Sequence, residues 1–354
     1  MEANATEPLE HGEDSSPRAI PSRRVAMALT LFFGPGVGHV YLGAIRRALA
    51  WGYVPIVLAV GLCVVVVRSR TGLGLLAPAM LLLVLVRLGA LFDIFLVPER
   101  RLRRLSGWLV LAFTLGVEMC GIAAMLWLRV NVVQAFQITA GSMRPSLLSN
   151  DHLFVDMGAF RHGPPKRGDL AVFKYPERPQ EDFIKRVIAL PGDKIEVRGG
   201  EAVINDWPLP HCTVGKNVTL PSSGYIDEGR GTLELEYVDD ASFLIFIDEH
   251  FVDAGRTWTV APNELFVLGD NRNNSMDSRA WFHGWGGGVP FENLLGQPLM
   301  IWLSFTETGQ INWPRLNTRL DVPHLLPSLA SFEPALRACL NSRPTNTDPP
   351  KAPN

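Results

Sequence analysis

A serine and a lysine in this chain have the residue types needed for nucleophilic catalysis. Ser142 lies between a glycine and a methionine in "ITAGSMRPSLL", and Lys185 lies in the apolar run "DFIKRVIALPGDKIEV". A serine hydroxyl becomes an effective nucleophile only when a nearby base accepts its proton. No Asp and His with recognisable context lie near the serine in the sequence, so the neutral amine of Lys185 is the candidate base. Together the two residues predict acyl transfer.

Lys185 can act as a base only where its surroundings favour the neutral amine. A lysine in water has a pKa of about 10.4, and desolvation must lower that pKa by about two or more. Alternation along a strand places Phe183 and Lys185 on one face and Ile184 and Arg186 on the other. Phe183, Ile184 and Val187 are the apolar neighbours that would desolvate the amine. The ordinary alternative is a lysine whose stem covers apolar surface while its ammonium reaches water.

The composition separates a membrane part from a soluble part. The 354 residues are 47% apolar with a formal net charge of −2, and the apolar excess is concentrated between about residues 25 and 130. Nucleic acid is not an expected partner, because the chain lacks the basic field that such binding requires. No Cys-x-x-Cys or His-Glu-x-x-His spacing occurs, so neither a metal nor another cofactor is predicted. A bond between Cys212 and Cys339 is left open.

Residues 25–128 are predicted to form a membrane region with three or four helices, after a polar, disordered tail over residues 1–24. Four apolar segments approach the roughly 20 residues that span a bilayer as a helix; they cover residues 25–44, 49–67, 73–97 and 108–128. The second and fourth are the clearest spans. The glycine-rich first segment fits a span or a re-entrant hairpin. The third contains Arg87 and Asp93, which would pair within a bundle or mark the end of a shorter span.

The arginine-rich loop "PERRLRRLSG", residues 98–107, predicts the orientation of the chain. Short loops rich in arginine and lysine stay in the cytoplasm. The fourth apolar segment would then leave the membrane on the opposite side. We therefore expect the chain after about residue 129, with Ser142, to lie outside the cytoplasm. The number of spans and the side of the N-terminus are left open.

Residues 129–315 are predicted to form a mostly β domain. Turn residues separate short β-rich runs such as "HLFVD", "DLAVFKY", "FIKRVIAL" and "ELFVLGD". The stretch from about 205 to 258 has a lower apolar content and is interpreted as a β-rich insertion. Residues 316–354 are predicted to be a Pro-rich C-terminal tail with one short amphipathic helix near 323–340.

Five boxes, in order, resemble the conserved boxes of bacterial type I signal peptidases, which are membrane-anchored Ser/Lys endopeptidases. They are "GSMRPSLL" at 141–148, "RGDLAVFKYP" at 167–176, "FIKRVIALPGDKI" at 183–195, "LGDNRNNSMDSRAW" at 268–281 and "GGVPFENLLGQ" at 287–297. The resemblance covers about residues 130–305. Together with the apolar segments, it predicts a multi-span α-helical membrane anchor followed by a mostly β catalytic domain of signal-peptidase type with a β-rich insertion.

The resemblance implies a role for each matching polar residue. Ser142 would be the nucleophile and Lys185 the general base. Ser275 would hydrogen-bond and orient the lysine, and Asp277 with Arg279 would form a structural ion pair beneath the site. Without the resemblance, the last three residues would be interpreted as a polar, Asn-rich turn.

The implied substrate site is a shallow cleft beside the serine. Six residues match the family's substrate-binding positions: Ile138, Ala140, Met143, Leu147, Phe183 and Ile184. The first two and the last two match strand edges that bind an extended chain by β-addition. Met143 and Leu147 match residues that line the small pockets or meet the lipid. Such pockets explain a preference for Ala-x-Ala sites in signal sequences, so exported preproteins with such sites, the lipid bilayer and the export machinery are the expected partners.

One position departs from the family's usual pattern. Many members carry a serine two residues before the nucleophile, where its hydroxyl donates to the oxyanion, but here that position is Ala140. Losing one such donor typically costs about 3 kcal/mol of transition-state stabilisation unless it is replaced. Some relatives also lack this hydroxyl, so Ala140 is interpreted as a tuned or compensated position.

Two other functions fit parts of the sequence. Self-cleaving repressors use the same Ser/Lys chemistry, but the apolar segments argue against them. A catalytically silent membrane scaffold that binds preproteins or assembly partners would explain Ala140, but not the retention of Ser142 and Lys185. The sequence therefore predicts a multi-pass serine endopeptidase of the bacterial cytoplasmic membrane. It would remove N-terminal signal peptides from exported preproteins, with its catalytic domain on the extracytoplasmic side.

Overall fold

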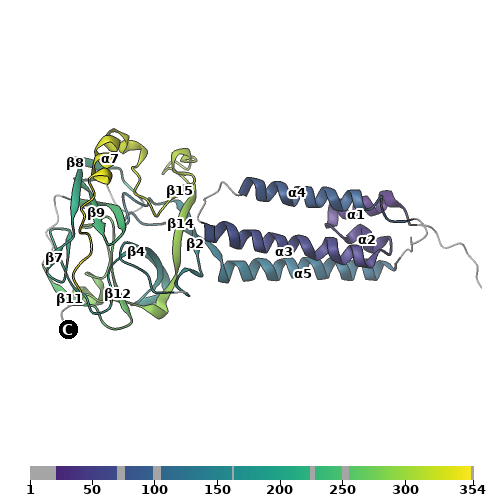
Figure 1. The fold of residues 1–354 in the computed structure, drawn as a ribbon, viewed down its shortest axis with the longest axis horizontal. Helices are drawn as coiled ribbons and strands as arrows, with labels where there is room; N and C mark the ends of the chain where they lie inside the picture. The colour runs from purple at the N-terminus through teal and green to yellow at the C-terminus, as the bar shows by residue number, and fades with distance from the viewer. Residues whose placement is uncertain are drawn as a thin grey trace, which may run out of the picture. The chain divides into compact units, whose positions relative to one another are not determined.

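The computed structural model describes residues 21–69, 76–98, 105–161, 163–223, 228–248 and 255–351. The chain forms two compact units: one comprises Met1–Gly61 and Pro78–Ala124, and the other comprises Leu62–Ala77 and Met125–Asn354. The first unit is helical and the second is mostly β (Figure 1). Most of the polar tail predicted for residues 1–24, and the arginines of the loop at 98–107, lie outside the described residues.

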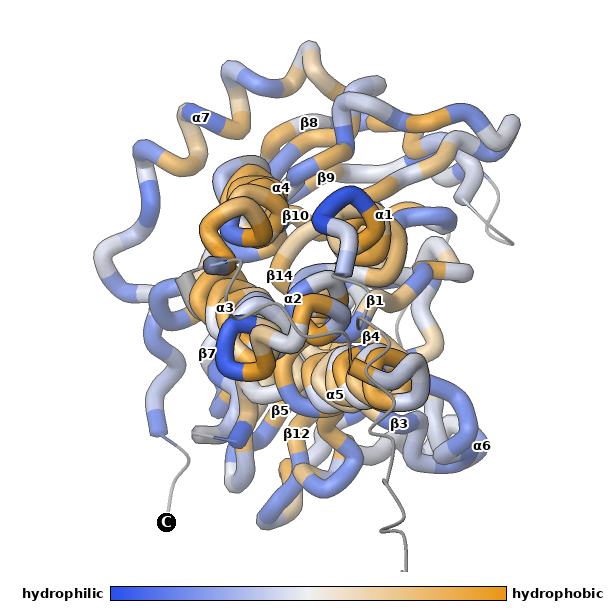
Figure 2. The backbone as a smooth tube through the Cα atoms, turned by 90° about the vertical axis from the view of Figure 1, so that its right-hand side faces the viewer, coloured by the Kyte–Doolittle hydropathy of each residue, from blue (hydrophilic) through white to orange (hydrophobic). Residues whose placement is uncertain are grey.

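The helical segments are apolar along most of their length (Figure 2). They are α1 Arg23–Phe33, α2 Val37–Tyr41, α3 Ile45–Ser69, α4 Leu76–Asp93 and α5 Gly107–Asn131. Among the described residues, two helices are long and apolar enough to cross a membrane, Ile45–Val67 and Gly107–Asn131. These correspond to the two clearest predicted spans. A multi-span anchor of three or four helices is therefore not confirmed.

The first apolar segment is divided between two short helices. Gly34 and Gly36 separate α1 from α2 and have φ angles of 106° and 91°, a region that L side chains rarely adopt. The 11 residues of α1 extend only about 16 Å as a helix, about half of the hydrocarbon thickness. This segment therefore resembles the hairpin alternative more than the spanning one.

Asp93 ends α4 and binds residues of the preceding helices. Its carboxylate accepts hydrogen bonds from Arg47 Nη1 at 2.8 Å and Trp51 Nε1 at 2.9 Å, and lies 3.1 Å from His39 Nε2. Arg87 does not pair with Asp93; it donates to the Leu31 carbonyl. Asp93 thus combines the two roles that the sequence left open, because it ends the helix and pairs within the bundle.

An eight-stranded antiparallel sheet forms the centre of the β unit. Its strands in sheet order are β1 Val133–Gln137, β2 Asp151–Asp156, β14 Leu294–Ser304, β3 Leu170–Tyr175, β4 Arg178–Ala189, β12 Glu264–Leu268 and β13 Val289–Pro290, and β15 Thr318–Arg319 pairs with β14. Short helical turns connect these strands: η3 Ala159–Arg161, α6 Trp281–Gly284, η4 Phe291–Asn293 and η5 Trp313–Arg315. The mostly β fold predicted for residues 129–315 is confirmed.

Two smaller sheets lie between β4 and β12 in the chain. A four-stranded sheet has the order β11 Thr257–Thr259, β5 Lys194–Arg198, β6 Glu201–Ile204 and β7 Trp207–Pro208. A three-stranded sheet has the order β10 Ala241–Asp248, β9 Gly229–Val238 and β8 His211–Leu220. The inserted sheets therefore begin about ten residues before the predicted start at 205. We call residues 194–259 the insertion.

The C-terminal segment expected as a tail is folded onto the insertion. It contains η6 Pro327–Phe332 and α7 Glu333–Asn341. Leu326, Leu329 and Leu336 share a buried cluster with residues of β8, β9 and β10, and a disulfide joins Cys339 to Cys212. The sequence had left this bond open. Buried leucines at helical spacing explain why the segment packs there, because the insertion offers the apolar surface that they need.

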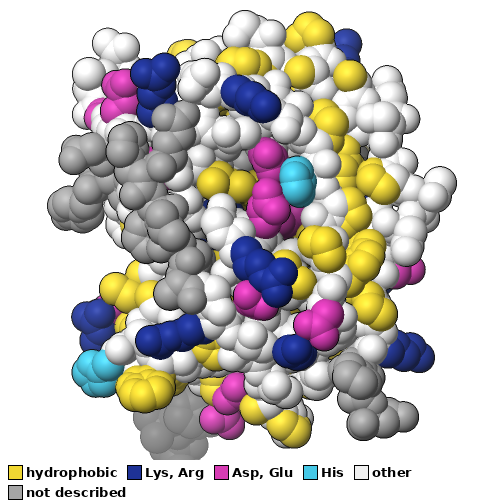
Figure 3. Space-filling view, turned by 90° about the vertical axis from the view of Figure 1, so that its left-hand side faces the viewer, with side chains coloured by type: hydrophobic (Ala, Val, Ile, Leu, Met, Phe, Trp, Pro, Cys, Tyr) yellow, Lys and Arg dark blue, Asp and Glu magenta, His cyan; other side chains and the backbone are white. Residues whose placement is uncertain are grey.

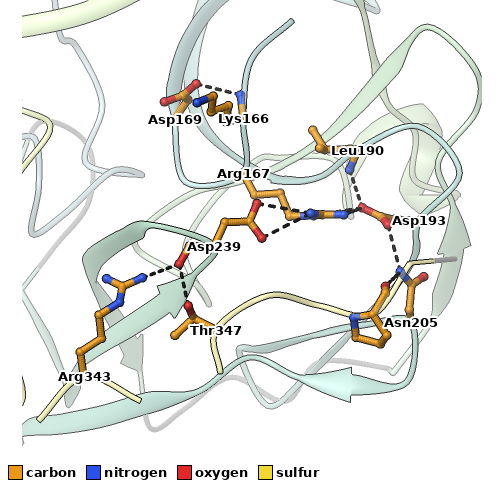
Figure 4. Close-up of polar contacts among 10 residues, drawn as sticks. Lys166, Arg167, Asp169, Leu190, Asp193, Asn205, Asp239, Arg343 and Thr347 are labelled. Atoms are coloured by element: carbon orange, nitrogen blue, oxygen red, sulfur yellow. Dashed lines mark hydrogen bonds and ion pairs between the residues drawn. The ribbon is translucent and has the colours of Figure 1, made fainter. Parts of the chain in front are cut away.

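A polar network fixes the end of this segment (Figure 4). Arg167 lies between Asp193 and Asp239, with its Nη2 2.7 Å from Asp193 Oδ2. The Asp239 carbonyl accepts hydrogen bonds from Arg343 and from the Thr347 hydroxyl. Arg167 thus connects the central part of the β unit to Asp239 of the insertion. Asp239 in turn binds Arg343 and Thr347 of the C-terminal segment.

Candidate active site

Three separate segments bring Ser142 and Lys185 together. Ser142 begins the turn after β1, Lys185 lies on β4, and residues 269–279 follow β12. Lys185 Nζ donates a hydrogen bond to Ser142 Oγ at 2.6 Å. Ser142 is half-buried, whereas Lys185 is only 4% exposed. The two side chains thus form the close pair that the sequence predicted.

The surroundings of Lys185 favour its neutral form. Burial lowers the pKa of Lys185 from 10.5 to about 8. The carboxylates of Asp277 and Asp270 raise this pKa and the Arg279 guanidinium lowers it, but burial has the largest effect. Lys185 Nζ lies 5.5 Å from the centroid of the Phe183 ring. This contact confirms that Phe183 and Lys185 share a face of β4, as alternation along the strand predicts.

Asn271 holds the backbone around Ser142. Its N–H donates to the Ser142 carbonyl at 3.1 Å, and its Nδ2 donates to the Gly141 carbonyl at 3.2 Å. Among the described residues, the Ser142 N–H donates to no protein acceptor. The carbonyls on both sides of this N–H are therefore fixed while the N–H itself is available.

Gly269 allows the turn after β12 to approach the nucleophile. A Cβ at this position would lie 2.2 Å from Ser275 Oγ and 2.5 Å from the Ser142 carbonyl oxygen. Both distances are far below van der Waals contact, and one of the two atoms belongs to the backbone. A side chain at residue 269 would therefore separate the turn from the loop that carries Ser142.

The structure differs from the expectation for Ser275. Its hydroxyl oxygen is buried against Gly269, but no hydrogen bond to Lys185 or to any other described residue is present. The one hydrogen bond of the Lys185 amine goes to Ser142 instead. Ser275 is thus next to the dyad and buried without a partner, rather than bound to the lysine.

Asp277 and Arg279 form the predicted ion pair. Arg279 Nε and Nη2 lie 2.9 Å from Asp277 Oδ1 and Oδ2 respectively, and the Gly269 N–H donates to Asp277 Oδ2 at 3.0 Å. Burial disfavours the charged carboxylate, but Arg279 and the Gly269 N–H outweigh burial and keep the pKa of Asp277 below its usual range. An ionised Asp277 thus anchors the turn through the Gly269 backbone.

A second buried ion pair was missed in the sequence. Arg186 Nε and Nη2 lie 2.7 Å and 2.6 Å from the two oxygens of Asp270, and Arg186 Nη1 donates to the Gly168 carbonyl at 2.7 Å. The guanidinium also lies 4.2 Å from the centroid of the Phe243 ring. The available signal was an arginine next to Lys185 in the apolar second half of β4. Asp270 precedes Asn271, so this pair connects β4 to the residue that holds the nucleophile loop.

The first half of β4 offers a free strand edge. Arg178 and residues 182–186 pair with β3, whereas pairing with β12 begins only at Arg186. Among the described strands, nothing pairs with the other edge of residues 178–185. Phe183 and Ile184 are half-buried on this edge, Ala140 is exposed, and Ile138 is buried.

Met143 and Leu147 do not lie where the sequence placed them. Their exposed fractions are 1% and 0%, and both pack in a core cluster with Ile138 and Leu153. Side chains this deeply buried neither line an open pocket nor meet lipid. The turn after Ser142 directs them inward, so they support the nucleophile loop from below.

The chain matches known proteins over the region that forms this site. Residues 111–303, more than half of the chain, match the family described as "Signal peptidase, peptidase S26". The chain is 32% identical to signal peptidase I of Pseudomonas aeruginosa over 218 residues, which cover 56% of this chain and 74% of that protein. It is 30% identical to signal peptidase I of Aquifex aeolicus over 273 residues, which cover 65% and 94% of the two chains.

The family match includes both members of the close pair and the whole 269–279 turn. It also includes α5 after residue 110 and seven of the eight strands of the central sheet, from β1 to β14. The chain therefore belongs to the signal peptidase family S26 and is a serine endopeptidase that removes signal peptides from preproteins.

Proposed function

We propose that Ser142 is the nucleophile of this peptidase and that Lys185 is its general base. The observation that carries the proposal is the 2.6 Å contact between Lys185 Nζ and Ser142 Oγ at a lysine that burial keeps at a pKa of about 8. A base with a pKa near the working pH accepts a proton readily and returns it readily.

The reaction runs in two steps of acyl transfer. Neutral Lys185 accepts the Ser142 proton as Oγ attacks the scissile carbonyl, and the resulting ammonium then protonates the leaving amine of the mature protein. This leaves the signal peptide bound to Ser142 as an ester. Lys185, neutral again, takes a proton from water, which attacks the ester; the lysine ammonium then returns this proton to Ser142 Oγ as the signal peptide leaves as the acid. Every proton transfer of the two steps passes through one nitrogen, Lys185 Nζ.

The residues around the dyad position it. We assign to Asp277 and Arg279 the role of holding the Gly269 backbone, which lies against both Ser275 and Ser142. Ser275 Oγ, buried without a partner, is the hydroxyl available to accept from or donate to Lys185 when Ser142 moves away to attack. Met143 and Leu147 anchor the nucleophile loop in the core.

The substrate would bind as an added strand. The open edge of β4 over residues 178–185 carries free backbone groups beside Lys185, which an extended chain can pair with. The exposed Ala140, two residues before Ser142, and the half-buried Phe183 and Ile184 would contact it. By its membership of the signal peptidase family, we propose that the chain selects alanine-like residues one and three positions before the cut, that is, Ala-x-Ala-like sites.

The anchor is proposed to be multi-pass, with α3 and α5 as the spans best supported by length and composition. The arginine-rich loop at 98–107 would stay in the cytoplasm. The catalytic unit after α5 would then lie on the extracytoplasmic side of the bacterial cytoplasmic membrane, where exported preproteins emerge. Association with the export machinery would bring the substrate to this side.

The dyad is tested by following acylation and cleavage in the same protein. Detergent-solubilised full chain is incubated with a β-lactam-like acylating inhibitor and, separately, with a preprotein carrying an Ala-x-Ala site. Wild type and the neighbouring control Ser149→Ala should gain the mass of one inhibitor and release mature product, and Ser142→Ala should do neither. Cleavage by Ser142→Ala would refute the assigned nucleophile, and inertness of all three would favour the scaffold.

A further prediction concerns the oxyanion. The Ser142 N–H donates to no acceptor in the described part of the chain, and the Ala140 side chain supplies no second donor. Ala140→Ser should raise kcat about tenfold or more, with KM little changed, because the new hydroxyl stabilises charge that develops only in the transition state. Steady-state cleavage of the same preprotein measures this, with Ala135→Ser, an exposed position on β1, as the matched control. An unchanged kcat would mean that another donor already serves the oxyanion.

A further inference from the structure

Three side chains of metal-ligand type meet in the insertion. Glu201 is the first residue of β6, His211 is the first residue of β8, and Glu234 lies on β9. His211 Nε2 is 3.7 Å from Glu201 Oε1 and 3.7 Å from Glu234 Oε2. The potential ligand atoms of all three residues lie within 4.8 Å of one another. Figure 3 shows acidic side chains beside a histidine on one face of the β unit.

Among the described residues, no lysine or arginine pairs with the buried carboxylate of Glu234. The residue is 7% exposed, and its Oε2 is buried without a hydrogen bond among the described residues. Its Oε1 has one long contact, 3.5 Å from Thr213 Oγ1. The distance of 3.7 Å to His211 is too long for a hydrogen bond. Removing an ionised carboxylate from water is costly unless a positive charge compensates it. In the described part of the chain, only His211 lies within ion-pair distance, and it compensates the charge only when its imidazole is protonated.

The next carboxylate on the same face of β9 shows the contrast. Glu236, two residues along, binds Arg272 through both of its oxygens, with Nη1 3.0 Å from Oε1. Arg272 also donates to the Gly200 carbonyl. The strand therefore buries two carboxylates on one face, and both terminal nitrogens of the described arginine that compensates Glu236 bind at Glu236 and Gly200. Glu234 instead faces a histidine and a second carboxylate.

We propose that Glu201, His211 and Glu234 bind a divalent transition-metal ion, with Zn²⁺ as the best match and water as the fourth ligand. Imidazole nitrogen with carboxylate oxygen is a common zinc donor set, at bond lengths of about 2.0–2.2 Å. Two such ligands around a tetrahedral ion lie about 3.3 Å apart. The observed 3.7 Å needs only a small closure, which the partly exposed Glu201 and His211 can make. Calcium and magnesium prefer all-oxygen sites.

The ion would connect the two sheets of the insertion. Glu201 belongs to the four-stranded sheet, whereas His211 and Glu234 belong to the three-stranded one. His211 precedes Cys212, whose disulfide holds α7 against β8. A metal at this point would stabilise the insertion and the attached C-terminal segment, and would take no part in the chemistry at Ser142.

Zinc binding by the full chain in detergent tests the proposal. The protein is purified without a polyhistidine tag, stripped with EDTA, and titrated with Zn²⁺ against a chromophoric chelator. We expect one Zn²⁺ per chain, and binding at least about tenfold weaker in Glu234→Gln and in His211→Gln. His283→Gln, at an exposed histidine outside the cluster, should bind like wild type. Co²⁺ should give the visible bands of a tetrahedral nitrogen and oxygen site in wild type and in His283→Gln, but not in Glu234→Gln or His211→Gln.

Glu201→Gln distinguishes loss of a metal ligand from misfolding, because this side chain is nearly half exposed. The substitution should weaken Zn²⁺ binding, while the Tm of the metal-free variant should stay near that of metal-free wild type. Zn²⁺ should raise the Tm of wild type and of His283→Gln by mass action, but not that of the three ligand variants. The proposal is wrong if wild type binds no Zn²⁺ up to about 100 μM, an affinity too weak to matter for stability, or if all variants bind equally.

Discussion

Lys185→Met should lower kcat/KM for preprotein cleavage by about 10³-fold or more, because a serine hydroxyl without a base is a poor nucleophile. Methionine has a similar length and no proton-accepting nitrogen, so it fills the space that the lysine stem occupies. Cleavage of a preprotein with an Ala-x-Ala site by the detergent-solubilised chain measures the loss. Ser142→Ala should lose as much, and the double variant no more, because the two residues act as one unit.

The same lysine sets the pH dependence of wild type. Since burial lowers the pKa of Lys185 to about 8, the neutral base is scarce at pH 6 and predominates above pH 8. The rate should therefore rise about tenfold per pH unit below the pKa and level off above about pH 9. A rate independent of pH between 6 and 9, or one that falls as pH rises, would contradict Lys185 as the base.

Stability separates a missing base from a misfolded protein. The pKa of Lys185 is about 8 in the folded chain against an ordinary value of 10.5, so the unfolded chain binds more protons between these pH values. Wild type should thus gain stability as pH rises from about 8 to 10.5, and this gain should be absent from Lys185→Met. At pH 7 the variant should be at least as stable as wild type, because it no longer buries an ammonium. A lower Tm would contradict this.

Local alternation was sufficient to predict many strands of the catalytic unit. The runs at β2, β3, β5, β10 and β12 are short, apolar or alternating, and bounded by turn residues, and each forms a strand. By contrast, β8 in "HCTVGKNVTL" is largely polar, and β14 contains Gly296 and Pro298 with register shifts. Such strands depend on long-range pairing, which no local pattern reports.

The sequence predicted those contacts of the site that follow from the types of the residues and their order in the matching boxes. Ser142 and Lys185 meet as expected, and Asp277 pairs with Arg279. The directions of side chains were less predictable, because the turn after Ser142 sends Met143 and Leu147 into the core. The Ser275 hydroxyl lies against Gly269 and makes no hydrogen bond among the described residues. A sequence pattern does not fix the position of such a hydroxyl.

Sequence spacing also missed contacts made between distant strands. Glu201, His211 and Glu234 come from three strands, so no short ligand motif joins them, and the sequence predicted no metal. Likewise Asp93 meets His39, Arg47 and Trp51 only after the helices pack. Length and hydropathy identified α3 and α5, but they could not show that two glycines break the first apolar segment.

Asp270→Asn should lower the free energy of unfolding by about 3–5 kcal/mol, the usual effect of leaving one member of a buried ion pair without its partner. Asp270 is fully buried, and Arg186 reaches it with two hydrogen bonds, so the substitution leaves a buried guanidinium uncompensated. Urea titration of the full chain measures the loss. Glu333→Gln removes an exposed ion pair with Arg337 and should cost less than about 1 kcal/mol.

A double variant distinguishes the buried charge from the lost packing. Arg186→Met with Asp270→Leu removes both charges and keeps apolar volume, so it should be more stable than Asp270→Asn alone. If the double variant is as unstable as Asp270→Asn, or if its loss of stability equals the sum of the two single losses, the pair stabilises the fold through packing and not through charge. The pH profile gives a second criterion: the Asp270 carboxylate raises the pKa of Lys185, so any active Asp270→Asn protein should reach its plateau at a lower pH than wild type. A buried pair that the sequence did not reveal would then contribute to the stability of the fold and to the proton affinity of the base.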